Sequence, residues 1–440
     1  MTLALAERNV PRYTSYPTAP HFTSAVNGDV YAQWLTGLPP TATLSLYIHV
    51  PFCTELCHYC GCNTRAVRKR EPVDAYAERL LEEIDLLGGL AGRKLTHLHW
   101  GGGTPSILGA DLLETIAAKL ASRFDLSGLK EHAIELDPRR LDRGLVRALQ
   151  AIGVTRASLG VQDTSPHVQQ AIGRIQPFDL VERAADWLRA AGIANLNIDL
   201  MYGLPAQTVR DVAHSAERAA SLGAQRLALF GYAHVPWFKT HQKLIDEASL
   251  PGLAERLKQA ETAAETLCGY GYEAVGLDHF ALPEDELAIA ARGGKLRRNF
   301  QGYTVDEADA LIGLGASAIG KLPQGFVQNA PDLGGYSRAV AAGRFPIVKG
   351  LALSDEDRLR AHLIERLMCD LALDLDTVAG GKARFAQELA ALAPLAEQGL
   401  VTIDGARIAV TPRGRPYVRI AAAAFDAYLA ADHKKHSLAV

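Results

Sequence analysis

The chain has 440 residues, enough for one large domain and a smaller one. Its 48% hydrophobic content excludes a disordered chain, and 46 Lys and Arg against 49 Asp and Glu exclude a globally basic surface for nucleic acid. No apolar run reaches the ~20 residues of a membrane span, and the N-terminus lacks the basic start of an export signal. We therefore expect a cytoplasmic protein that binds no nucleic acid and has no membrane span.

Residues 1–40 are expected to form an irregular arm. The stretch PRYTSYPTAPHF contains three prolines and little periodicity. Tyr13, Tyr16 and Phe22 stand among these prolines, and aromatic side chains in such arms usually lie on another surface. We therefore predict an ordered strap rather than a disordered tail.

From about residue 42, predicted strands and helices alternate. The segment LSLYIHV (44–50) is β-branched and aromatic, as a buried strand should be. Further strands are predicted at 95–100, 133–136, 155–161, 195–200 and 226–232, and helices at 73–90, 110–123, 142–152, 178–191, 207–222 and 253–270. Six strand–helix units predict an α/β fold with a parallel sheet covered by helices, forming an open or closed barrel.

The pattern changes beyond about residue 275. NFQGYT (299–304) is too polar for a core strand and is expected to line a site, while GLGASAIG (313–320) is interpreted as a small-residue segment that lets backbone approach a ligand. A helix capped by Ser354, a second helix, a hairpin turning at Asp404-Gly405 and a last helix predict a mostly helical, winged-helix-like end. The predicted domains are an arm (1–40), a catalytic domain with its extension (41–350) and a C-terminal domain (351–440).

The stretch PFCTELCHYCGCNT (51–64) holds four of the six cysteines. A disulfide knot is disfavoured, because disulfide scaffolds are short secreted chains with cysteines spread along them. Structural zinc remains an alternative, although it usually takes a second cysteine pair farther along. Cys53, Cys57 and Cys60 supply three thiolates from one tight loop, a pattern that favours an iron–sulfur cluster with one iron left open.

Polar residues follow the predicted strands at the edge where parallel barrels carry their chemistry. They are Glu135, Asp137, Gln162, Asp199, Tyr232 and His234. A buried carboxylate in a strand is costly unless it is paired or functional, so we interpret Glu135 and Asp199 as ligand contacts. The alternative is that these residues are ordinary strand-end caps.

The cysteine triplet, with Tyr59 before its third member, resembles that of the radical S-adenosylmethionine (SAM) enzymes. Together, YTSYPTA, HVPFCTELCHYCGCN, HWGGGTPS, DHFALP, NFQGYT and GLGASAI resemble the oxygen-independent coproporphyrinogen III oxidases, from about residue 10 to the C-terminal domain. The resemblance implies a partial (β/α)6 TIM-type barrel with an N-terminal arm over the active site and a C-terminal helical domain. It also implies conversion of two propionate side chains of coproporphyrinogen III to vinyl groups, giving protoporphyrinogen IX in haem biosynthesis.

The same resemblance implies the roles of individual residues. Cys53, Cys57 and Cys60 would hold a 4Fe–4S cluster, and Cys62 would be an extra cysteine that is not a ligand. Contacts to the SAM on the cluster would fall to Tyr47, Gly102, Glu135 and Ile319, with Tyr47 and Glu135 at the catalytic centre. Contacts to a second SAM would fall to Tyr59, Gly103, Thr104, Gln162, Arg174, Asp199 and Ala233. Phe300 and Gln301 would lie near the substrate.

The expected partners are coproporphyrinogen III and a low-potential electron donor of the flavodoxin or ferredoxin kind, and the chain is expected to be a monomer. Two rival interpretations belong to the same superfamily. A haem chaperone usually lacks the YTSYPT arm and the fourth cysteine, both of which are present. A haem-opening methyltransferase is disfavoured by NFQGYT and by the complete second-SAM set. The oxidase is therefore the favoured interpretation.

Overall fold

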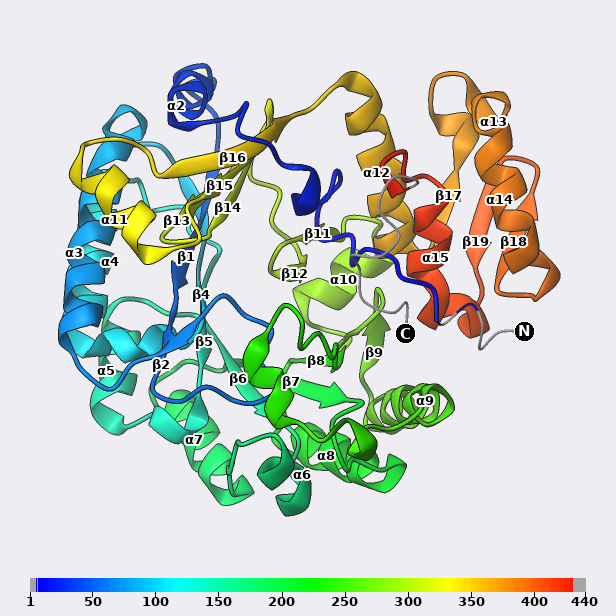
Figure 1. The fold of residues 1–440 in the computed structure, drawn as a ribbon, viewed down its shortest axis with the longest axis horizontal. Helices are drawn as coiled ribbons and strands as arrows, with labels where there is room; N and C mark the ends of the chain where they lie inside the picture. Colours follow the sequence, from blue (N-terminus) through cyan, green and yellow to red (C-terminus); the bar gives the residue numbers. More distant parts are fainter. Residues whose placement is uncertain (1–4, 6, 430–440) are drawn as a thin grey trace.

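The computed structural model describes residue 5 and residues 7–429; the rest of the predicted C-terminal domain, 430–440, lies outside them (Figure 1). Six neighbouring parallel strands form the middle of a 12-stranded sheet. They are β1 (Leu44–Val50), β4 (Leu95–Gly102), β5 (Glu131–Leu136), β6 (Arg156–Gln162), β7 (Asn195–Tyr202) and β8 (Arg226–Gly231). All six predicted strands are therefore confirmed.

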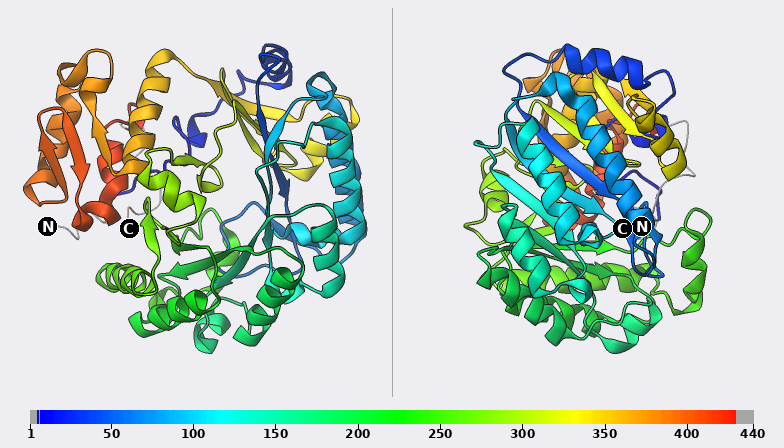
Figure 2. Two further views of the ribbon diagram at one scale, coloured as in Figure 1. Left: turned by 180° about the vertical axis from the view of Figure 1, so that it is seen from behind. Right: turned by 90° about the vertical axis from the view of Figure 1, so that its left-hand side faces the viewer.

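Helices cover the outer side of this curved sheet, as Figures 1 and 2 show. They are α3 (Glu71–Leu86), α4 (Gly109–Arg123), α5 (Arg143–Ala151), α6 (Pro166–Ala171), α7 (Phe178–Ala190), α8 (Val209–Ser221) and α9 (Leu253–Gly269). Side-chain caps start several of them: Asp142 accepts a hydrogen bond from Leu145 N, and Thr208 forms a capping box with Asp211. Leu44, Ile48 and Val50 of β1 are fully buried, as expected for an inner parallel strand.

The sheet continues beyond the six predicted strands. On one side β13 (Ala310–Leu314) pairs parallel with β1 and is followed by the antiparallel strands β14 (Ile319–Leu322), β15 (Gly325–Asn329) and β16 (Ile347–Ala352). On the other side β10 (His279–Ala281) pairs antiparallel with β8, and β9 (Glu273–Val275) pairs antiparallel with β10. The segment GLGASAIG thus contains the end of β13, the connecting turn and the start of β14. Its glycines lower β propensity, which hid these strands from the sequence pattern.

Smaller elements lie outside the main sheet. NFQGYT is not a core strand, as predicted, because β11 (Arg297–Asn299) and β12 (Gly302–Thr304) form a separate hairpin. The cysteine loop is bounded by β2 (Phe52–Cys53) and β3 (Arg65–Ala66). The remaining helices of this region are α10 (Glu286–Arg292) and α11 (Leu333–Ala341).

The arm is ordered, as predicted, but it is not irregular throughout. It contains the helix α2 (Gly28–Thr36), which the prolines of the preceding stretch concealed. Before α2, the arm packs on the C-terminal domain: Tyr13 OH donates to Asp426 Oδ2 at 3.0 Å, and Tyr16 OH accepts from Ala427 N at 3.0 Å. Both tyrosines are buried in that domain's apolar core.

The C-terminal domain lies on the side of the sheet opposite to α3 and α4 (Figure 1). It consists of α12 (Asp355–Asp370), β17 (Ala372–Asp374), α13 (Gly381–Arg384), α14 (Ala386–Glu397), β18 (Val401–Asp404), β19 (Arg407–Val410) and α15 (Val418–Ala423). Ser354 forms a capping box with Asp357, and the three strands make one small sheet, as in a winged helix. No helix in the described part of the chain is both long and apolar enough to cross a membrane.

Candidate functional site

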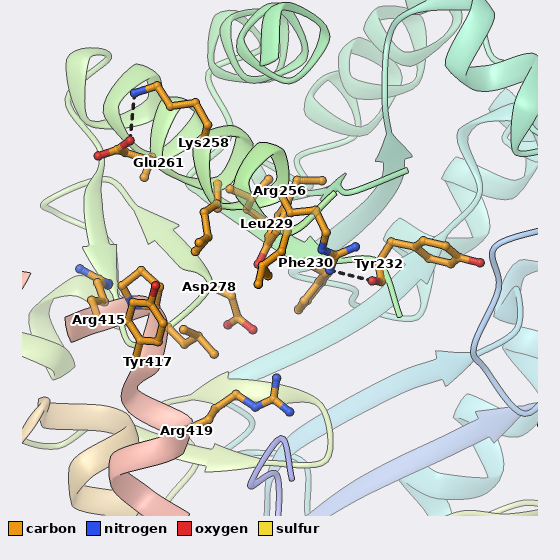
Figure 3. A pocket seen from close by; sticks show the side chains of 18 of the residues that line it. Leu229, Phe230, Tyr232, Arg256, Lys258, Glu261, Asp278, Arg415, Tyr417 and Arg419 are labelled. Carbon is orange, nitrogen blue, oxygen red and sulfur yellow. Dashed lines mark hydrogen bonds and ion pairs between the residues drawn. The ribbon is translucent and has the colours of Figure 1, made fainter. Parts of the chain in front are cut away.

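The carboxyl ends of β7 and β8 meet a cavity of about 1240 Å³ between the sheet, α9 and the C-terminal domain (Figure 3). Of the predicted site residues, Ala233 lies in its wall. A second cavity of about 430 Å³ lies between the arm, the β11–β12 hairpin and α12, and Phe300 lies in its wall. The predicted cluster cysteines lie on a loop at the same edge of the sheet.

The cysteine loop follows β1 and is closed at its base by backbone bonds. Arg65 N donates to Pro51 O at 3.0 Å, and Val67 N donates to Cys53 O at 2.8 Å. All four cysteines of the loop are free; Cys57 is buried, and Cys62 is exposed. The short β2–β3 pairing thus closes a tight loop that carries the three predicted cluster cysteines.

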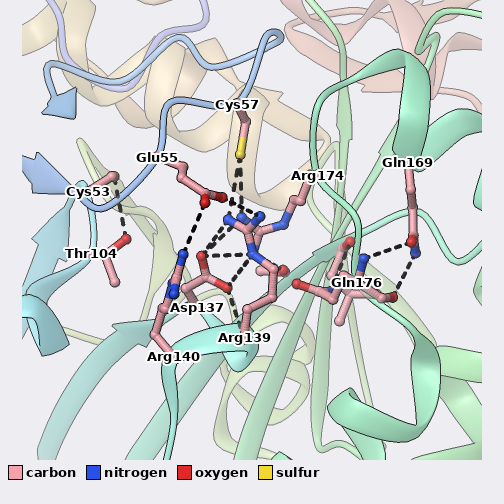
Figure 4. A network of polar contacts seen from close by, with 12 residues as sticks. Cys53, Glu55, Cys57, Thr104, Asp137, Arg139, Arg140, Gln169, Arg174 and Gln176 are labelled. Carbon is pink, nitrogen blue, oxygen red and sulfur yellow. Dashed lines mark hydrogen bonds and ion pairs between the residues drawn. The ribbon is translucent and has the colours of Figure 1, made fainter. Parts of the chain in front are cut away.

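Hydroxyl groups and guanidinium groups surround two of these thiols (Figure 4). Thr104 Oγ1 donates to Cys53 Sγ at 3.4 Å, while burial raises the pKa of that thiol. Arg174 Nη1 donates to Cys57 Sγ at 3.5 Å. A hydrogen bond with the Cys62 thiol lowers the pKa of Cys60 to about 7. Donors and positive charge favour the thiolate form, which is the form that binds metal.

The three thiols fit an iron–sulfur cluster better than zinc. Among the residues described, no three Cys, His, Asp or Glu side chains converge so that they could hold one metal ion. Structural zinc requires such convergence, whereas cysteine ligands of a 4Fe–4S cluster bind different irons. Three free thiols on one loop, with a buried arginine beside Cys57, are a suitable donor set for a cluster.

Arg174 belongs to a buried ion-pair network that the sequence analysis did not foresee (Figure 4). Arg174 Nη2 donates to Asp137 Oδ1 at 3.2 Å and to Gly160 O at 2.6 Å, and Arg139 Nη2 donates to Asp137 Oδ2 at 2.7 Å. Burial raises the pKa of the Asp137 carboxyl, but the Arg139 hydrogen bond and the Arg174 charge outweigh it and lower that pKa. Arg174, expected to contact a second SAM, is thus already paired with Asp137 and oriented toward Cys57.

Tyr47 lies on β1 with its hydroxyl group 3.0 Å from His49 Nδ1. His49 Nε2 lies 2.9 Å from Asn63 O, and since a carbonyl only accepts, Nε2 carries the proton and Nδ1 accepts from Tyr47. Burial lowers the pKa of His49, so its ring stays neutral. The pair therefore connects the strand to the end of the cysteine loop.

Glu135 lies on β5, facing β4. His99 Nε2 donates to Glu135 Oε1 at 3.2 Å, and Gly102 N donates to Oε2 at 3.1 Å. Burial raises the pKa of the Glu135 carboxyl, but the hydrogen bond and charge of His99 outweigh it, and the pKa is lowered. The side chain is therefore an ionised carboxylate at neutral pH. His99 was missed, although its place in LTHLHW two residues after His97 marked it as facing the same side.

The glycines of GGGTPS lie against the base of the cysteine loop. Gly102 has φ +114°, and a Cβ there would lie 2.7 Å from the His49 ring. A Cβ on Gly103 would lie 2.5 Å from the Phe52 carbonyl oxygen and 2.4 Å from Thr64 Oγ1. Close packing against β2 therefore already requires both glycines.

Gln162 and Asp199 lie on the neighbouring strands β6 and β7. Gln162 ends β6 with φ +70°, so the chain turns at that residue. Asp199 was expected at a strand end, but β7 continues to Tyr202 because LMY remains buried or half-buried. Its carboxylate accepts from Ser158 Oγ at 3.0 Å and from Asn197 Nδ2 at 2.8 Å. Burial, reinforced by the charge of Glu135, raises the pKa of Asp199 to about 6.

Of the other predicted site residues, Tyr59 belongs to the cysteine loop and Ile319 lies near β1, whereas Phe300 and Gln301 lie in the β11–β12 hairpin. The Tyr59 ring packs on the apolar cluster that includes Leu204 and Tyr232. Ile319 starts β14 and packs closely on Gly313: a Cβ at Gly313 would lie 2.8 Å from the Ile319 carbonyl carbon. Gly313 in turn pairs with Tyr47 of β1. Phe300 instead packs edge-on against Phe326, with ring centroids 6.1 Å apart. Phe300 lines the smaller cavity, and Gln301 follows it in the turn between β11 and β12.

A loop after β8 holds the cysteine loop through its backbone carbonyls, and the sequence analysis missed it. Gln242 Nε2 donates to Tyr59 O at 2.9 Å, His241 Nε2 to Cys60 O at 2.7 Å, and Lys239 Nζ to Cys62 O at 2.8 Å. These residues stand in WFKTHQK, which has no periodicity or known motif. Only the fold brings them to the cysteines.

Family models match two parts of the chain. The model of the Radical SAM superfamily matches residues 47–219, and that of the HemN C-terminal domain matches residues 353–417. The first range includes the cysteine loop and β1 to most of α8. The second begins just before α12 and ends before α15.

Curated relatives are similar along the whole chain. The oxygen-independent coproporphyrinogen III oxidase of Bradyrhizobium diazoefficiens is 46% identical, over 100% of this chain and 99% of its own. The enzyme of the same name from Paracoccus denitrificans is 45% identical over 97% and 96%. The solved structure of coproporphyrinogen III oxidase (HemN) from Escherichia coli, a radical SAM enzyme, superposes with a TM-score of 0.90 at 38% identity, over 95% of this chain and 98% of that one.

Proposed function

Because the chain belongs to the family of oxygen-independent coproporphyrinogen III oxidases, which are radical SAM enzymes, we propose that its active centre is the cysteine loop with the strand ends beside it. The reaction of the enzyme is the oxidative decarboxylation of two propionate side chains of coproporphyrinogen III to vinyl groups, which gives protoporphyrinogen IX. This place for the active centre is supported by three free thiols at the carboxyl edge of the parallel sheet, where Arg174 donates a hydrogen bond to Cys57.

Family membership implies a 4Fe–4S cluster and SAM, and we assign the cluster to Cys53, Cys57 and Cys60. When bound, the cluster and SAM supply a 5′-deoxyadenosyl radical that takes a hydrogen atom from an unactivated propionate carbon, which no side-chain base could deprotonate. The chain contributes thiolates, which the neighbouring Arg174 and Thr104 stabilise through hydrogen bonds to sulfur.

Around the cluster we assign SAM contacts to Tyr47, Gly102, Glu135 and Ile319. The ionised Glu135 can accept hydrogen bonds from a cationic amino group, which supports its place there. Gly102 lies beside this carboxylate, because its N–H group donates to Glu135 Oε2 at 3.1 Å. Tyr47 would keep its orientation through the neutral His49.

We extend the proposal to a second SAM and to the substrate. The second SAM would contact Tyr59, Gly103, Thr104, Gln162, Arg174, Asp199 and Ala233, and the substrate would contact Phe300 and Gln301. Gln162, Asp199 and Ala233 belong to or follow three adjacent strands, which supports a common ligand. The Asp199 carboxylate suits ribose hydroxyl groups, since its present partners are likewise neutral donors.

The remaining assignments concern the surroundings of the enzyme. We propose a low-potential flavodoxin- or ferredoxin-like electron donor, and exposed Arg65, Arg68 and Lys69 beside the cysteine loop would suit an acidic carrier. We also propose that the enzyme is a monomer. The free thiols suit a reducing compartment such as the cytoplasm.

The test is an anaerobic assay of the reconstituted protein with reductant, SAM and coproporphyrinogen III. Protoporphyrin after oxidation of the products, with matching 5′-deoxyadenosine, supports the proposal. Replacement of Cys53, Cys57 or Cys60 by Ala is expected to abolish cluster iron and turnover, whereas Cys62→Ala keeps both. Full cluster iron in Cys53→Ala would refute the ligand assignment, and tight haem binding without turnover would indicate a haem chaperone.

A further inference from the structure

The cavity of about 1240 Å³ between β8, α9 and the C-terminal domain is rich in arginine (Figure 3). Four segments far apart in the sequence supply them: the arm, α9, β11 and residues 413–419, which run into α15. The arginines are Arg12, Arg256, Arg298, Arg413, Arg415 and Arg419. The fold therefore gathers cations here that the sequence scatters.

Several guanidinium N–H groups in this wall are buried without a protein acceptor. Within the described residues, Arg298 Nε and Nη1, Arg256 Nε and Arg415 Nη2 have no hydrogen-bond partner. The Arg298 side chain is only 5% exposed. Buried donors of this kind are almost always satisfied, and these three arginines of the cavity lining keep donors without an acceptor, so the wall has spare hydrogen-bonding capacity for a ligand with several acceptors.

The charges in the wall require an anion. Asp278 is the buried carboxylate among these arginines, and Arg298 Nη1 is 3.9 Å from its Oδ1. Lys258 and Glu261, also in the lining, pair with each other at the surface. Burial lowers the pKa of Arg256 and of Arg415, and burial together with the charge of Arg12 lowers the pKa of Arg419 to about 9. Burial thus disfavours the charged form of Arg256 and of Arg415, and an anion bound in the cavity would favour it.

The rest of the wall is apolar. Leu229, Phe230, Leu257, Phe280 and Tyr417 line the cavity between the arginines. A ligand that fits this wall has a large apolar body and several carboxylates at its periphery. A tetrapyrrole with propionate side chains has that form, and the volume is large enough for one.

The cavity reaches the strand ends that border the proposed active centre. Its lining includes Ala233, Tyr202 and Tyr232, which stand at or just after the carboxyl ends of β7 and β8. Arg256 Nη2 donates to Tyr232 O at 2.9 Å, and Arg12 Nη2 donates to Gly231 O at 3.3 Å. Two of the arginines are thereby fixed to the strand end that leads to the site.

We propose that this cavity binds the propionate groups of the tetrapyrrole that are not reacting, with Arg256, Arg298 and Arg415 as their hydrogen-bond donors. The inference rests on the proposed function and deepens it by naming specificity residues for the substrate. Since one propionate reacts at a time, the others need fixed partners that hold the macrocycle in place. Bidentate arginine pairing provides both direction and charge.

The test uses the reconstituted holoenzyme and coproporphyrin III, the stable oxidised porphyrin with the same four carboxylates. Binding is measured by titration of the porphyrin absorbance, with the tetramethyl ester as the uncharged probe. Arg415→Gln and Arg256→Gln are each expected to weaken coproporphyrin binding about tenfold and to leave ester binding unchanged. Arg338→Gln, at an exposed position of α11, is the matched control and is expected to bind both probes as the unsubstituted enzyme does.

Three measurements distinguish the outcomes: porphyrin affinity, the KM for coproporphyrinogen III, and turnover by the unsubstituted enzyme. Equal binding of acid and ester by the unsubstituted enzyme, or unchanged affinity in both arginine variants, would overturn the inference. A raised KM for coproporphyrinogen III in these variants, with iron content and far-UV circular dichroism as in the unsubstituted enzyme, would support it. Absence of turnover by the unsubstituted enzyme would overturn the proposed function, whereas turnover with unchanged KM in the variants would overturn only this inference.

Discussion

At the scale of single residues, the charge of Glu135 is set by its two donors. His99 and the backbone of Gly102 each bond one of its oxygens, and together they hold the carboxylate in the ionised form despite burial. The neighbouring Asp199 has only neutral donors, and its pKa is raised to about 6. The two carboxyl groups on one side of the sheet therefore differ in charge state at slightly acidic pH, and only Glu135 is a fixed anion.

Glu135→Gln tests this assignment. The substitution keeps the size of the side chain and removes its charge, so SAM affinity is expected to fall roughly ten- to a hundredfold, corresponding to the ~1.5–3 kcal/mol of a hydrogen bond to a charged group. Equilibrium dialysis with labelled SAM measures it. Glu114→Gln, on the exposed side of α4, is the control. Unchanged affinity would mean that Glu135 only joins β4 to β5.

At the scale of elements, β4 and β5 are joined by a buried pair that depends on pH. Trp100 Nε1 donates to His132 Nε2 at 2.8 Å, so that nitrogen must be unprotonated. Burial lowers the pKa of His132 to about 4. The unfolded chain, with an ordinary histidine pKa of about 6.5, therefore binds more protons between those values, and stability is lost as the pH falls from 6.5 toward 4.

From this pair we predict a specific acid sensitivity. Between pH 7 and pH 5 the free energy of unfolding should fall by about 2 kcal/mol through His132, and His132→Gln should remove that part of the fall. Guanidinium unfolding curves at the two pH values, followed by tryptophan fluorescence, measure it. The exposed His214→Gln should show the fall of the unsubstituted protein. An equal fall in His132→Gln would show that other groups cause the acid sensitivity.

The loop after β8 holds the cysteine loop in place through hydrogen bonds to its backbone carbonyls. Gln242 is buried and bonds the carbonyls of Tyr59 and Ala233 and the Val235 N–H group. Gln242→Ala leaves these groups unpaired, at a cost of ~1–3 kcal/mol for each one that stays buried. We expect the reconstituted cluster to be lost about tenfold faster to an iron chelator, as followed by its visible absorbance. Gln170→Ala, at an exposed position, should leave the rate unchanged; the same rate in both variants would argue against this role.

At the scale of the whole molecule, the arm joins the catalytic sheet to the C-terminal domain. Tyr13 and Tyr16 bond Asp426 and Ala427 in the C-terminal domain, and Arg12 bonds Gly231 after the last parallel strand. Farther along, Thr23 pairs with Gly350 at the edge of β16. The arm thus contacts both the sheet and the C-terminal domain, which flank the large cavity, and these two sets of contacts hold the arm in place.

Tyr13→Phe should loosen this connection. Loss of the hydrogen bond from Tyr13 to the Asp426 carboxylate is expected to lower the free energy of unfolding by about 1.5–3 kcal/mol and to speed proteolytic cleavage of the arm. Urea unfolding and timed digestion with mass spectrometry of the fragments measure the two effects. Tyr270→Phe, on a half-exposed side chain, is the control. Cleavage and stability equal to those of the control would show that the tyrosine ring alone holds the arm.

Periodicity predicted the six parallel strands and the helices between them, since each is long and buried along its length or on one face. The capped helix at Ser354 and the hairpin at Asp404-Gly405 were also predicted, because their signals lie within a few residues. The cysteine triplet is likewise a local signal, because one tight loop supplies all three thiols. Short or glycine-containing strands such as β13 and β14 were missed, because pairing with distant strands forms them.

What the amino-acid sequence determined by itself was therefore the alternation of elements and the chemistry of the cysteine loop, which depend on neighbouring residues. The tertiary structure alone decided that Arg174 pairs with Asp137, that Gln242 holds the cysteine loop, and that arginines from four segments line one cavity. Long-range contacts of this kind leave no local pattern, because each partner is chosen by the packing of the whole sheet and the domain beside it.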